Sequence, residues 1–323
     1  MTNSDIDPKP RTFGFLLVPG FALMSYSSAA EPLRAANVLA HRELYRWRHI
    51  STDGRGIPAS NGISVTPDLS VGDEVDLDAV IVCAGGNPSQ FVHAPTIRWL
   101  RGMARRGVRL GGVSGGAYVL ARAGLLDGYR CTIHWEHAAA FEEEFPDLDV
   151  RHTLFEIDRD RLTCAGGTAA LDMMHAVIEH EQGHDLAAEV SEWFLQTRVR
   201  LGSGSQRMDA RERYGVTSQR LIRALDYMDS HIENPVRRAV LARIAGVSVR
   251  QLERLFSEQL QSTIADHYLK IRLERAHTLL RETALSLVEV GLAAGFVSPS
   301  HFSRSYRKRH GMAPSRARRD FKQ

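Results

Sequence analysis

Two related stretches near the end of the chain decide its organisation: VLARIAGVSVRQLERLF (residues 240–256) and LVEVGLAAGFVSPSHFSRSY (residues 287–306). In each, an apolar helical pattern ends at a glycine, Gly246 or Gly295, and a serine follows just before a second helical pattern. Glycine adopts the left-handed conformation at a helix end without steric cost, and serine accepts hydrogen bonds from the free amides of the next helix. The stretches therefore predict two helix-turn-helix motifs, which present a second helix to the major groove of DNA.

The second helix of each motif separates into an apolar face and a polar face. Residues four apart predict the packed face: Leu252 and Phe256 in the first motif, Phe302 and Tyr306 in the second. The residues expected to contact DNA are Arg250, Gln251, Arg254, Ser300, His301, Arg304, Arg307 and Lys308. Arginine can donate two hydrogen bonds to guanine, and glutamine can pair with adenine. We expect Arg307 and Lys308 to contact phosphates, and any single arginine can instead contact a phosphate or solvent.

Charge is distributed unevenly along the 323 residues. Residues 1–200 carry 19 Lys and Arg against 26 Asp and Glu, a net charge of −7, whereas residues 201–323 carry 22 against 12, a net charge of +10. A basic end joined to an acidic body indicates a polyanionic partner for that end. Together with the two motifs, it predicts binding to double-stranded promoter DNA, although charge alone fits a solvated surface equally well.

Composition argues against several other classes of protein. The three cysteines are widely spaced, with no CxxC pair typical of zinc and no framework typical of a secreted domain. The polar first residues lack the apolar core of a signal peptide, and no run reaches the ~18 apolar residues of a membrane helix. We therefore expect a cytoplasmic protein with reduced thiols, no membrane partner, no cofactor and no bound metal.

Residues 12–200 alternate between strand and helix patterns. Thr12–Val18 (TFGFLLV), Leu77–Cys83 (LDAVIVC) and Val108–Val113 are predicted strands, and Ala29–His41 is a predicted helix. Such alternation predicts a parallel sheet covered by helices, here a flavodoxin-like α/β sandwich, followed by an all-α domain with two helix-turn-helix motifs. The expected parts are a disordered tail (1–11), an effector-sensing domain (12–200), a linker (201–216) and a DNA-binding domain (217–323).

Glycine-rich turns follow three of the predicted strands. The sequence GVSGG (residues 112–116) fits the G-x-S-x-G elbow, which exposes its central side chain at a strand end. Gly85-Gly86 and Gly166-Gly167 follow two other strands. Because the carboxyl ends of parallel strands meet at one edge of a sheet, these turns are expected to surround one pocket.

The segments around these turns resemble a known family. LDAVIVCAGG (residues 77–86), GGVSGGAYVLARAGLLDGYRCTIHW (111–135) and RLTCAGGTAALDMMHAVIEHEQG (161–183) resemble the PfpI-like branch of the class I glutamine amidotransferase-like fold, over about residues 12–195. GFVSPSHFSRSYRKRHGMAP (295–314) resembles the AraC-type DNA-binding domain.

The combination is similar to amidotransferase-like AraC regulators. That resemblance implies a transcriptional activator that responds to a small amine or amino-acid-like metabolite such as betaine, carnitine or arginine. It also leads us to expect a homodimer through the N-terminal domain and RNA polymerase as a further partner.

The resemblance also bears on chemistry at the elbow. Enzymes of the PfpI-like branch usually carry a cysteine there, with a histidine nearby, whereas this chain has Ser114. We therefore expect no catalytic residue and a ligand site instead, formed by Phe21, Gly85, Gly86, Ser114, His134, Trp135 and Glu136. Aromatic rings would suit a cationic amine, and backbone amides near the glycines a carboxylate. A serine-based amidase or hydrolase, with His134 as base and Glu136 orienting it, remains the alternative.

One further motif has a familiar pattern. His180-Glu-Gln-Gly-His184 fits the HExxH pattern of zinc proteases. Zinc binding requires both histidines on one face of a continuous helix, and Gly183 is expected to end the helix between them. We therefore expect no zinc site here.

Overall fold

The computed structural model describes residues 9–321, and the chain divides into two compact units at Gln206 and Arg207. The division falls inside the stretch predicted as linker, residues 201–216. Of the predicted disordered tail, residues 1–8 lie outside the described residues, while Arg11 is already the first residue of a strand. The part up to Gln206 is called the α/β unit below, and the part from Arg207 the helical unit.

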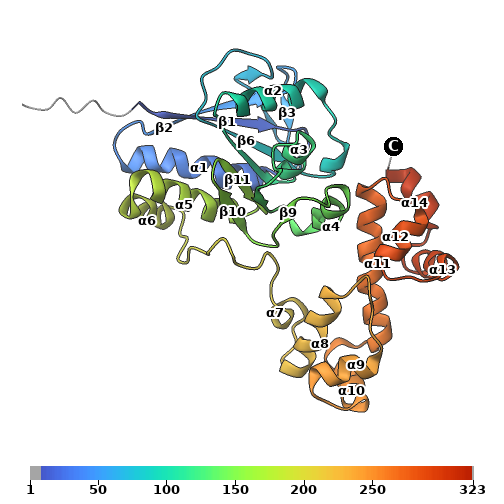
Figure 1. Cartoon of the computed structure of the whole chain (residues 1–323). Coiled ribbons are helices and arrows are strands. Elements are labelled where there is room, and N and C mark those ends of the chain that lie inside the picture. Colours follow the sequence, from blue (N-terminus) through green and yellow to red (C-terminus); the bar gives the residue numbers. More distant parts are fainter. Residues whose placement is uncertain (1–8, 322–323) are drawn as a thin grey trace, which may run out of the picture. The chain divides into compact units, whose positions relative to one another are not determined.

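The α/β unit is built on a seven-stranded sheet (Figure 1) with the order β10-β11-β7-β6-β1-β2-β5. The strands are β1 (Arg11–Leu17), β2 (Tyr45–Ser51), β5 (Leu69–Ser70), β6 (Ala79–Ala84), β7 (Arg109–Ser114), β10 (Phe155–Asp158) and β11 (Arg161–Cys164). All pairs are parallel except β10 with β11. Two small sheets join β3 (Ile57–Pro58) to β4 (Ser64–Val65) and β8 (Arg130–Cys131) to β9 (Asp149–Val150).

Helices cover both faces of the sheet, as the predicted parallel sandwich requires. One face packs on α1 (Leu23–Leu39), α5 (Ala169–Gln182) and α6 (His184–Trp193), the other on α2 (Ala94–Arg105), α3 (Gly116–Arg122) and α4 (Trp135–Glu144). Strand alternation distributes β1 between the two cores: Phe15 and Leu17 face the first, and Leu16 the second. A short 3₁₀ helix, Pro88–Gln90, follows β6.

The start of α1 differs from the sequence prediction. This helix begins at Leu23 rather than Ala29, and it includes three serines and Pro32. Serine and proline favour other conformations in helix interiors, so the pattern gave no helix signal there. Tertiary packing overrides that preference, since Ser25 is buried and bonded to the turn that follows β11.

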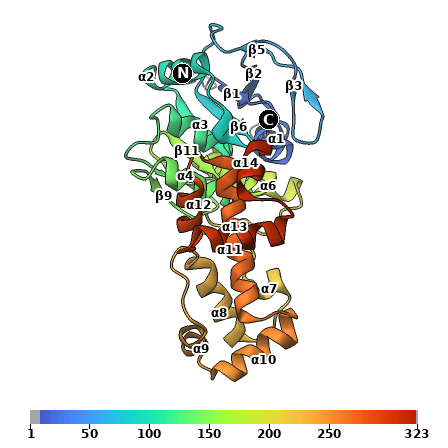
Figure 2. The same cartoon turned by 90° about the vertical axis from the view of Figure 1, so that its right-hand side faces the viewer.

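The helical unit contains eight helices within the described residues (Figure 2). They are α7 (Ala210–Tyr214), α8 (Gln219–Ser230), α9 (Arg238–Ala245), α10 (Val249–Leu260), α11 (Ile264–Glu282), α12 (Leu287–Ala293), α13 (Pro299–His310) and α14 (Pro314–Phe321). The long α11 runs between the group α8–α10 and the group α12–α14. Both predicted motifs are present, as α9–α10 and α12–α13. Within residues 9–321, no helix combines the length and apolarity needed to span a bilayer.

Candidate DNA-reading surface and effector site

The first motif has the predicted turn. Gly246 ends α9 with a left-handed φ of +70°, and Ser248 caps α10. Leu252 and Phe256 are fully buried, which confirms the assignment of this face to the core. The opposite face of α10 is therefore available to a partner.

The three residues expected to read bases on α10, Arg250, Gln251 and Arg254, are all exposed. Gln251 also completes the capping box of α10. Its Oε1 accepts a hydrogen bond from Ser248 N at 3.0 Å, and its own N donates to Ser248 Oγ at 3.3 Å. Bidentate pairing with adenine needs the same amide oxygen as an acceptor. The capping box therefore competes with base reading at Gln251.

The second motif has the same plan with different neighbours. Gly295 has a φ of +77°, and Pro299 occupies the start of α13 after the capping residue Ser298. Phe302 and Tyr306 are buried, as predicted. The residues expected to contact DNA, Ser300, His301, Arg304, Arg307 and Lys308, all lie exposed on α13.

Arg272, on α11, joins this second turn to the long helix. Its Nε donates to Ala294 O at 3.0 Å, its Nη2 donates to Gly295 O at 2.7 Å, and its guanidinium lies 4.1 Å from the ring centroid of Phe296. Burial lowers the pKa of Arg272 from its usual value. Charge-assisted bonds to the carbonyls at a helix end are strong, so this side chain fixes the second motif on α11.

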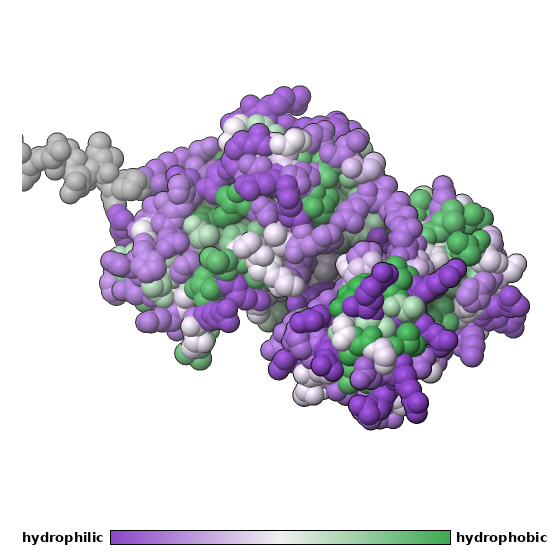
Figure 3. All heavy atoms as spheres, turned by 60° about the horizontal axis from the view of Figure 1, so that its bottom comes forward, coloured by the Kyte–Doolittle hydropathy of each residue, from purple (hydrophilic) through white to green (hydrophobic). Residues whose placement is uncertain are grey.

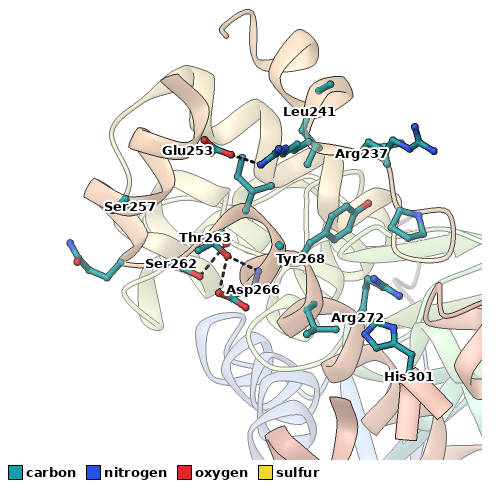
Figure 4. A pocket seen from close by; sticks show the side chains of 18 residues that line it. Arg237, Leu241, Glu253, Ser257, Ser262, Thr263, Asp266, Tyr268, Arg272 and His301 are labelled. Atoms are coloured by element: carbon teal, nitrogen blue, oxygen red, sulfur yellow. Dashed lines mark hydrogen bonds and ion pairs between the residues drawn. The ribbon is translucent and has the colours of Figure 1, made fainter. Parts of the chain in front are cut away.

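A groove of about 1340 Å³ lies between the two motifs (Figure 4). It is lined by the start of α9, the last turns of α10, the start of α11 and one residue of α13, His301. Its charged residues are partly paired, as Arg238 bonds Glu253 at 2.9 Å and Asp266 accepts from Thr263 Oγ1 at 2.8 Å. In the surface view (Figure 3), projecting hydrophilic side chains surround hydrophobic patches on the helical unit.

In the α/β unit, Ser114 ends the inner strand β7, which lies between β11 and β6, in an unusual backbone conformation. Its φ is +57° and its side chain is buried. The other four non-glycine residues with positive φ in the described part of the chain are exposed. A left-handed backbone is unfavourable for serine, and such strain concentrates at functional sites, as in the elbow motif.

The predicted convergence of the three turns is present. A Cβ at Gly166 would lie 2.8 Å from Ser114 Cβ, and one at Gly115 would lie 2.9 Å from Pro88 Cβ, directly after the Gly85-Gly86 turn. Gly85 itself packs against the backbone of residues 20–22, where a Cβ would lie 2.8 Å from Gly20 O. Gly86 is exposed, with a φ of +61°. These turns can be this close only because their glycines lack side chains.

His134 lies beside the elbow through its main chain, since its N donates to Ser114 O at 3.4 Å. The ring caps α4, with Nδ1 accepting from Glu136 N at 3.3 Å. In a neutral imidazole, an accepting Nδ1 places the proton on Nε2. A catalytic base needs the opposite tautomer, with a free Nε2 that accepts the serine proton. This orientation argues against the serine hydrolase alternative.

The expected aromatic residues differ in their surroundings. Phe21 is fully buried and meets Tyr26 edge to face at 5.7 Å, so it belongs to the core beneath the turn. Trp135 is 46% exposed at the start of α4 and stacks obliquely on His134 at 5.3 Å. Trp135 is therefore the one of the two rings that is accessible to a ligand.

One group of residues has metal-ligand chemistry. The ligand atoms of His134, Glu136 and His137 lie within 4.8 Å of one another. However, the accepting Nδ1 of His134 places its proton on Nε2, so binding a metal through either nitrogen would disturb the cap of α4. In the HExxH segment, Gly183 has a φ of +96° and separates α5 from α6, so the two histidines lie on different helices, as the sequence predicted.

Three residues that contribute to these sites were not found from the sequence. Ser25 accepts from Gly167 N at 2.7 Å beneath the elbow, Arg272 fixes the second turn, and Gln206 bonds the segment before His134. Each acts across more than 20 residues of sequence, and none lies in a motif. Arg272 gives no signal either, because α11 carries other charged residues close by, such as Lys270 and Glu274.

An α/β domain with a strained elbow, joined to two helix-turn-helix motifs, indicates a DNA-binding transcription regulator. Residues 14–180 match the DJ-1/PfpI family, and residues 241–320 match the helix-turn-helix domain. The HTH-type transcriptional regulator CdhR of Pseudomonas aeruginosa is 47% identical over 95% of this chain and 91% of its own. The HTH-type transcriptional regulator GlxA of Rhizobium meliloti is 46% identical over 95% of both chains.

A solved structure agrees with these relatives. The crystal structure of an AraC family transcriptional regulator from Pseudomonas putida is 30% identical, with a TM-score of 0.51 over 57% of this chain and 100% of its own. The chain therefore belongs to the DJ-1/PfpI family and is a DNA-binding transcriptional regulator of the AraC family. The relatives are transcriptional regulators, which supports the expectation of a non-enzyme.

Proposed function

We propose that the α/β unit binds a small amine or zwitterionic metabolite at the elbow and that this binding controls promoter recognition by the two motifs. The observation that carries the proposal is the buried, left-handed Ser114 surrounded by the turns of three strands. The resemblance to the PfpI-like branch implies that this position corresponds to the catalytic cysteine of its enzymes, and we infer that it serves binding here.

The chemistry of the elbow suits a ligand with two unlike ends. Nε2–H of His134 and the amides of the Gly85-Gly86 turn would donate to a carboxylate. The accessible ring of Trp135 and the carboxylate of Glu136 would attract the cationic end. Glycine betaine, carnitine and arginine all combine a cationic group with a carboxylate, so they are the first compounds to test.

The experiment is titration calorimetry of the full chain with these three compounds. We expect one of them to bind, with His134→Asn weakening binding by about tenfold, the effect of one lost hydrogen bond to a charged group. His152→Asn is the matched control, because His152 is an exposed histidine paired with Glu142 at 2.9 Å. Binding by none of the three, or equal losses in both variants, would contradict the proposal.

On the DNA side, we propose that Arg250, Arg254, Ser300, His301 and Arg304 reach base edges and that Arg307 and Lys308 hold phosphates. The exposure of all seven supports this assignment. Affinity should fall with salt, with a logarithmic slope of about 0.9 per phosphate contact. Arg307→Ala should reduce that slope without changing the preferred sequence. We further propose a cytoplasmic homodimer that activates transcription with RNA polymerase.

A further inference from the structure

The last residues of the α/β unit run along its surface as an extra edge segment. Ser205 forms an antiparallel bridge with Thr153, and Leu154 N donates to Gly202 O at 2.8 Å. A Cβ at Gly202 would lie 2.8 Å from Phe155 O, so this approach requires glycine. Residues 202–206 are therefore held by backbone contacts before the chain enters the helical unit at Arg207.

Gln206, the last residue of this segment, makes the contacts closest to the elbow. Its Nε2 donates to Thr132 Oγ1 at 3.0 Å, Ile133 O at 2.9 Å and Thr153 O at 2.8 Å. Its Oε1 is buried as well, with no hydrogen-bond partner among the described residues. The two N–H groups of this amide are shared among three acceptors, which fixes its orientation. Thr153 O also accepts from Thr132 Oγ1, so loss of the amide would mainly remove the partner of Ile133 O, which is unfavourable.

Two of the three acceptors of Gln206, Thr132 Oγ1 and Ile133 O, belong to the segment that carries the proposed ligand residues. Thr132 is fully buried, and its N donates to Thr163 Oγ1 on β11 at 2.9 Å. Ile133 precedes His134, whose N donates to Ser114 O. Ile133 and His134 therefore connect the junction at Gln206 and Arg207 to the elbow. Ile133 O accepts from Gln206 Nε2, and His134 N donates to Ser114 O.

From these contacts we propose that Gln206 is a positioning residue that couples the elbow segment, residues 132–136, to the junction between the units. A ligand that moves this segment displaces two acceptors of Gln206, Thr132 Oγ1 and Ile133 O, and so changes how residues 202–206 are held. The coupling to a ligand rests on the proposed function of the elbow. The mechanical link does not, because it consists of contacts within the α/β unit.

A second glutamine supplies a matched control. Gln196 lies in the same connecting region, and its Nε2 donates to Asp172 Oδ1 at 2.7 Å, next to the Arg200–Asp172 ion pair. Its Oε1 is also buried without a partner in the described chain. Gln196 thus anchors the chain to α5, away from the elbow segment, by the same kind of side chain.

The test is amide hydrogen exchange of the full chain without ligand, comparing wild type with Gln206→Ala, Gln206→Glu and Gln196→Ala. Gln206→Glu has the same shape and, when ionised, cannot donate. Both Gln206 variants should increase exchange of Leu154 and of residues 132–136 by about tenfold, since local opening governs exchange. Gln196→Ala should increase exchange at Arg200, whose N donates to Asp172, and leave residues 132–136 unchanged.

Wild-type exchange of residues 132–136 in both Gln206 variants would overturn the coupling. If both Gln206 variants lose protection throughout the sheet, Thr132→Val replaces them in the test. This substitution removes one acceptor of Gln206 with little change of shape, and it should increase exchange of Leu154 and residues 132–136 to a smaller extent. In a second arm, glycine betaine, carnitine and arginine are each added. A compound that binds should alter exchange of residues 202–206 in wild type but not in Gln206→Ala. Failure of all three to bind would contradict the elbow function alone, because the ligand-free comparison decides the coupling.

Discussion

The two helix-turn-helix motifs share a sequence pattern but differ in how their turns are supported. A Cβ on Gly246 would meet no heavy atom of the described chain within 4 Å beyond its own neighbours. A Cβ on Gly295 would lie 2.4 Å from Ile232 O and 2.8 Å from Pro235 Cδ. The second turn is therefore packed against the segment before the first motif, and Arg272 binds it from α11.

This difference shows that duplication of a pattern does not duplicate its structural role. The glycine of the first motif provides only a backbone conformation, whereas the glycine of the second also permits close packing. The second turn thereby sets the spacing of the two reading helices, α10 and α13, through α11. Four predictions should show how the two motifs differ.

The largest difference is expected between Gly295→Ala and Gly246→Ala. Alanine at Gly246 should lower the stability of the helical unit by about 1–2 kcal/mol, the strain of a left-handed residue. At Gly295, overlap with the backbone adds to that strain, for a total of about 2–5 kcal/mol. Native-state hydrogen exchange of α11 in urea measures the helical unit alone. Equal losses of stability in the two variants would show that the second turn is packed no more tightly than the first.

The next largest effect concerns base reading by the two helices. Arg304→Ala should weaken binding to the preferred DNA by about 1–3 kcal/mol and relax the preference at one base pair. Gel-shift titrations against the preferred site and single-base variants test this. If affinity falls equally for every sequence, Arg304 contacts a phosphate instead.

Gln251 on the first motif should behave differently from Arg304. Because its amide oxygen completes the capping box, Gln251→Ala should lower stability by about 0.5–2 kcal/mol. Gln251→Glu keeps an acceptor for Ser248 N and should retain stability, with the base preference of the chain unchanged. A new preference in Gln251→Glu would assign base reading to this position despite the cap.

The smallest effect should come from pH, through histidines packed behind the motifs. Burial lowers the pKa of His267 behind the first motif and of both His277 and His310 behind the second. The rings of His277 and His310 stack at 4.7 Å. Nearby positive charge lowers both pKa values further: His310 and Arg281 act on His277, and Arg309 acts on His310. Because the unfolded chain binds more protons, stability is complete above about pH 6.5 and falls as pH decreases below it.

Thermal unfolding followed by circular dichroism between pH 7.5 and 5 tests this dependence. His310→Gln should reduce the pH dependence more than His267→Gln, since it removes one member of a stacked pair. The same pH dependence in all three proteins would contradict the assignment.

The sequence predicted the parts of this molecule that depend on local pattern. The buried strands of the sheet, the two glycine turns and the packed faces of α10 and α13 follow from apolar spacing and turn chemistry, and the structure confirms them. The parts it did not predict depend on distant contacts: the first turns of α1, the antiparallel β10, and the linker segment held by Gln206. Such contacts leave no periodic signal, because a polar residue that bonds a remote backbone resembles an exposed one.

Both motifs are expected to read DNA at once, at a spacing fixed by α11. The most direct measurement is selection of binding sites by the full chain from a random duplex library at physiological salt. We expect two blocks of preferred bases about 10 base pairs apart, one turn of the double helix. A single block, or no enrichment over random duplex, would contradict this expectation.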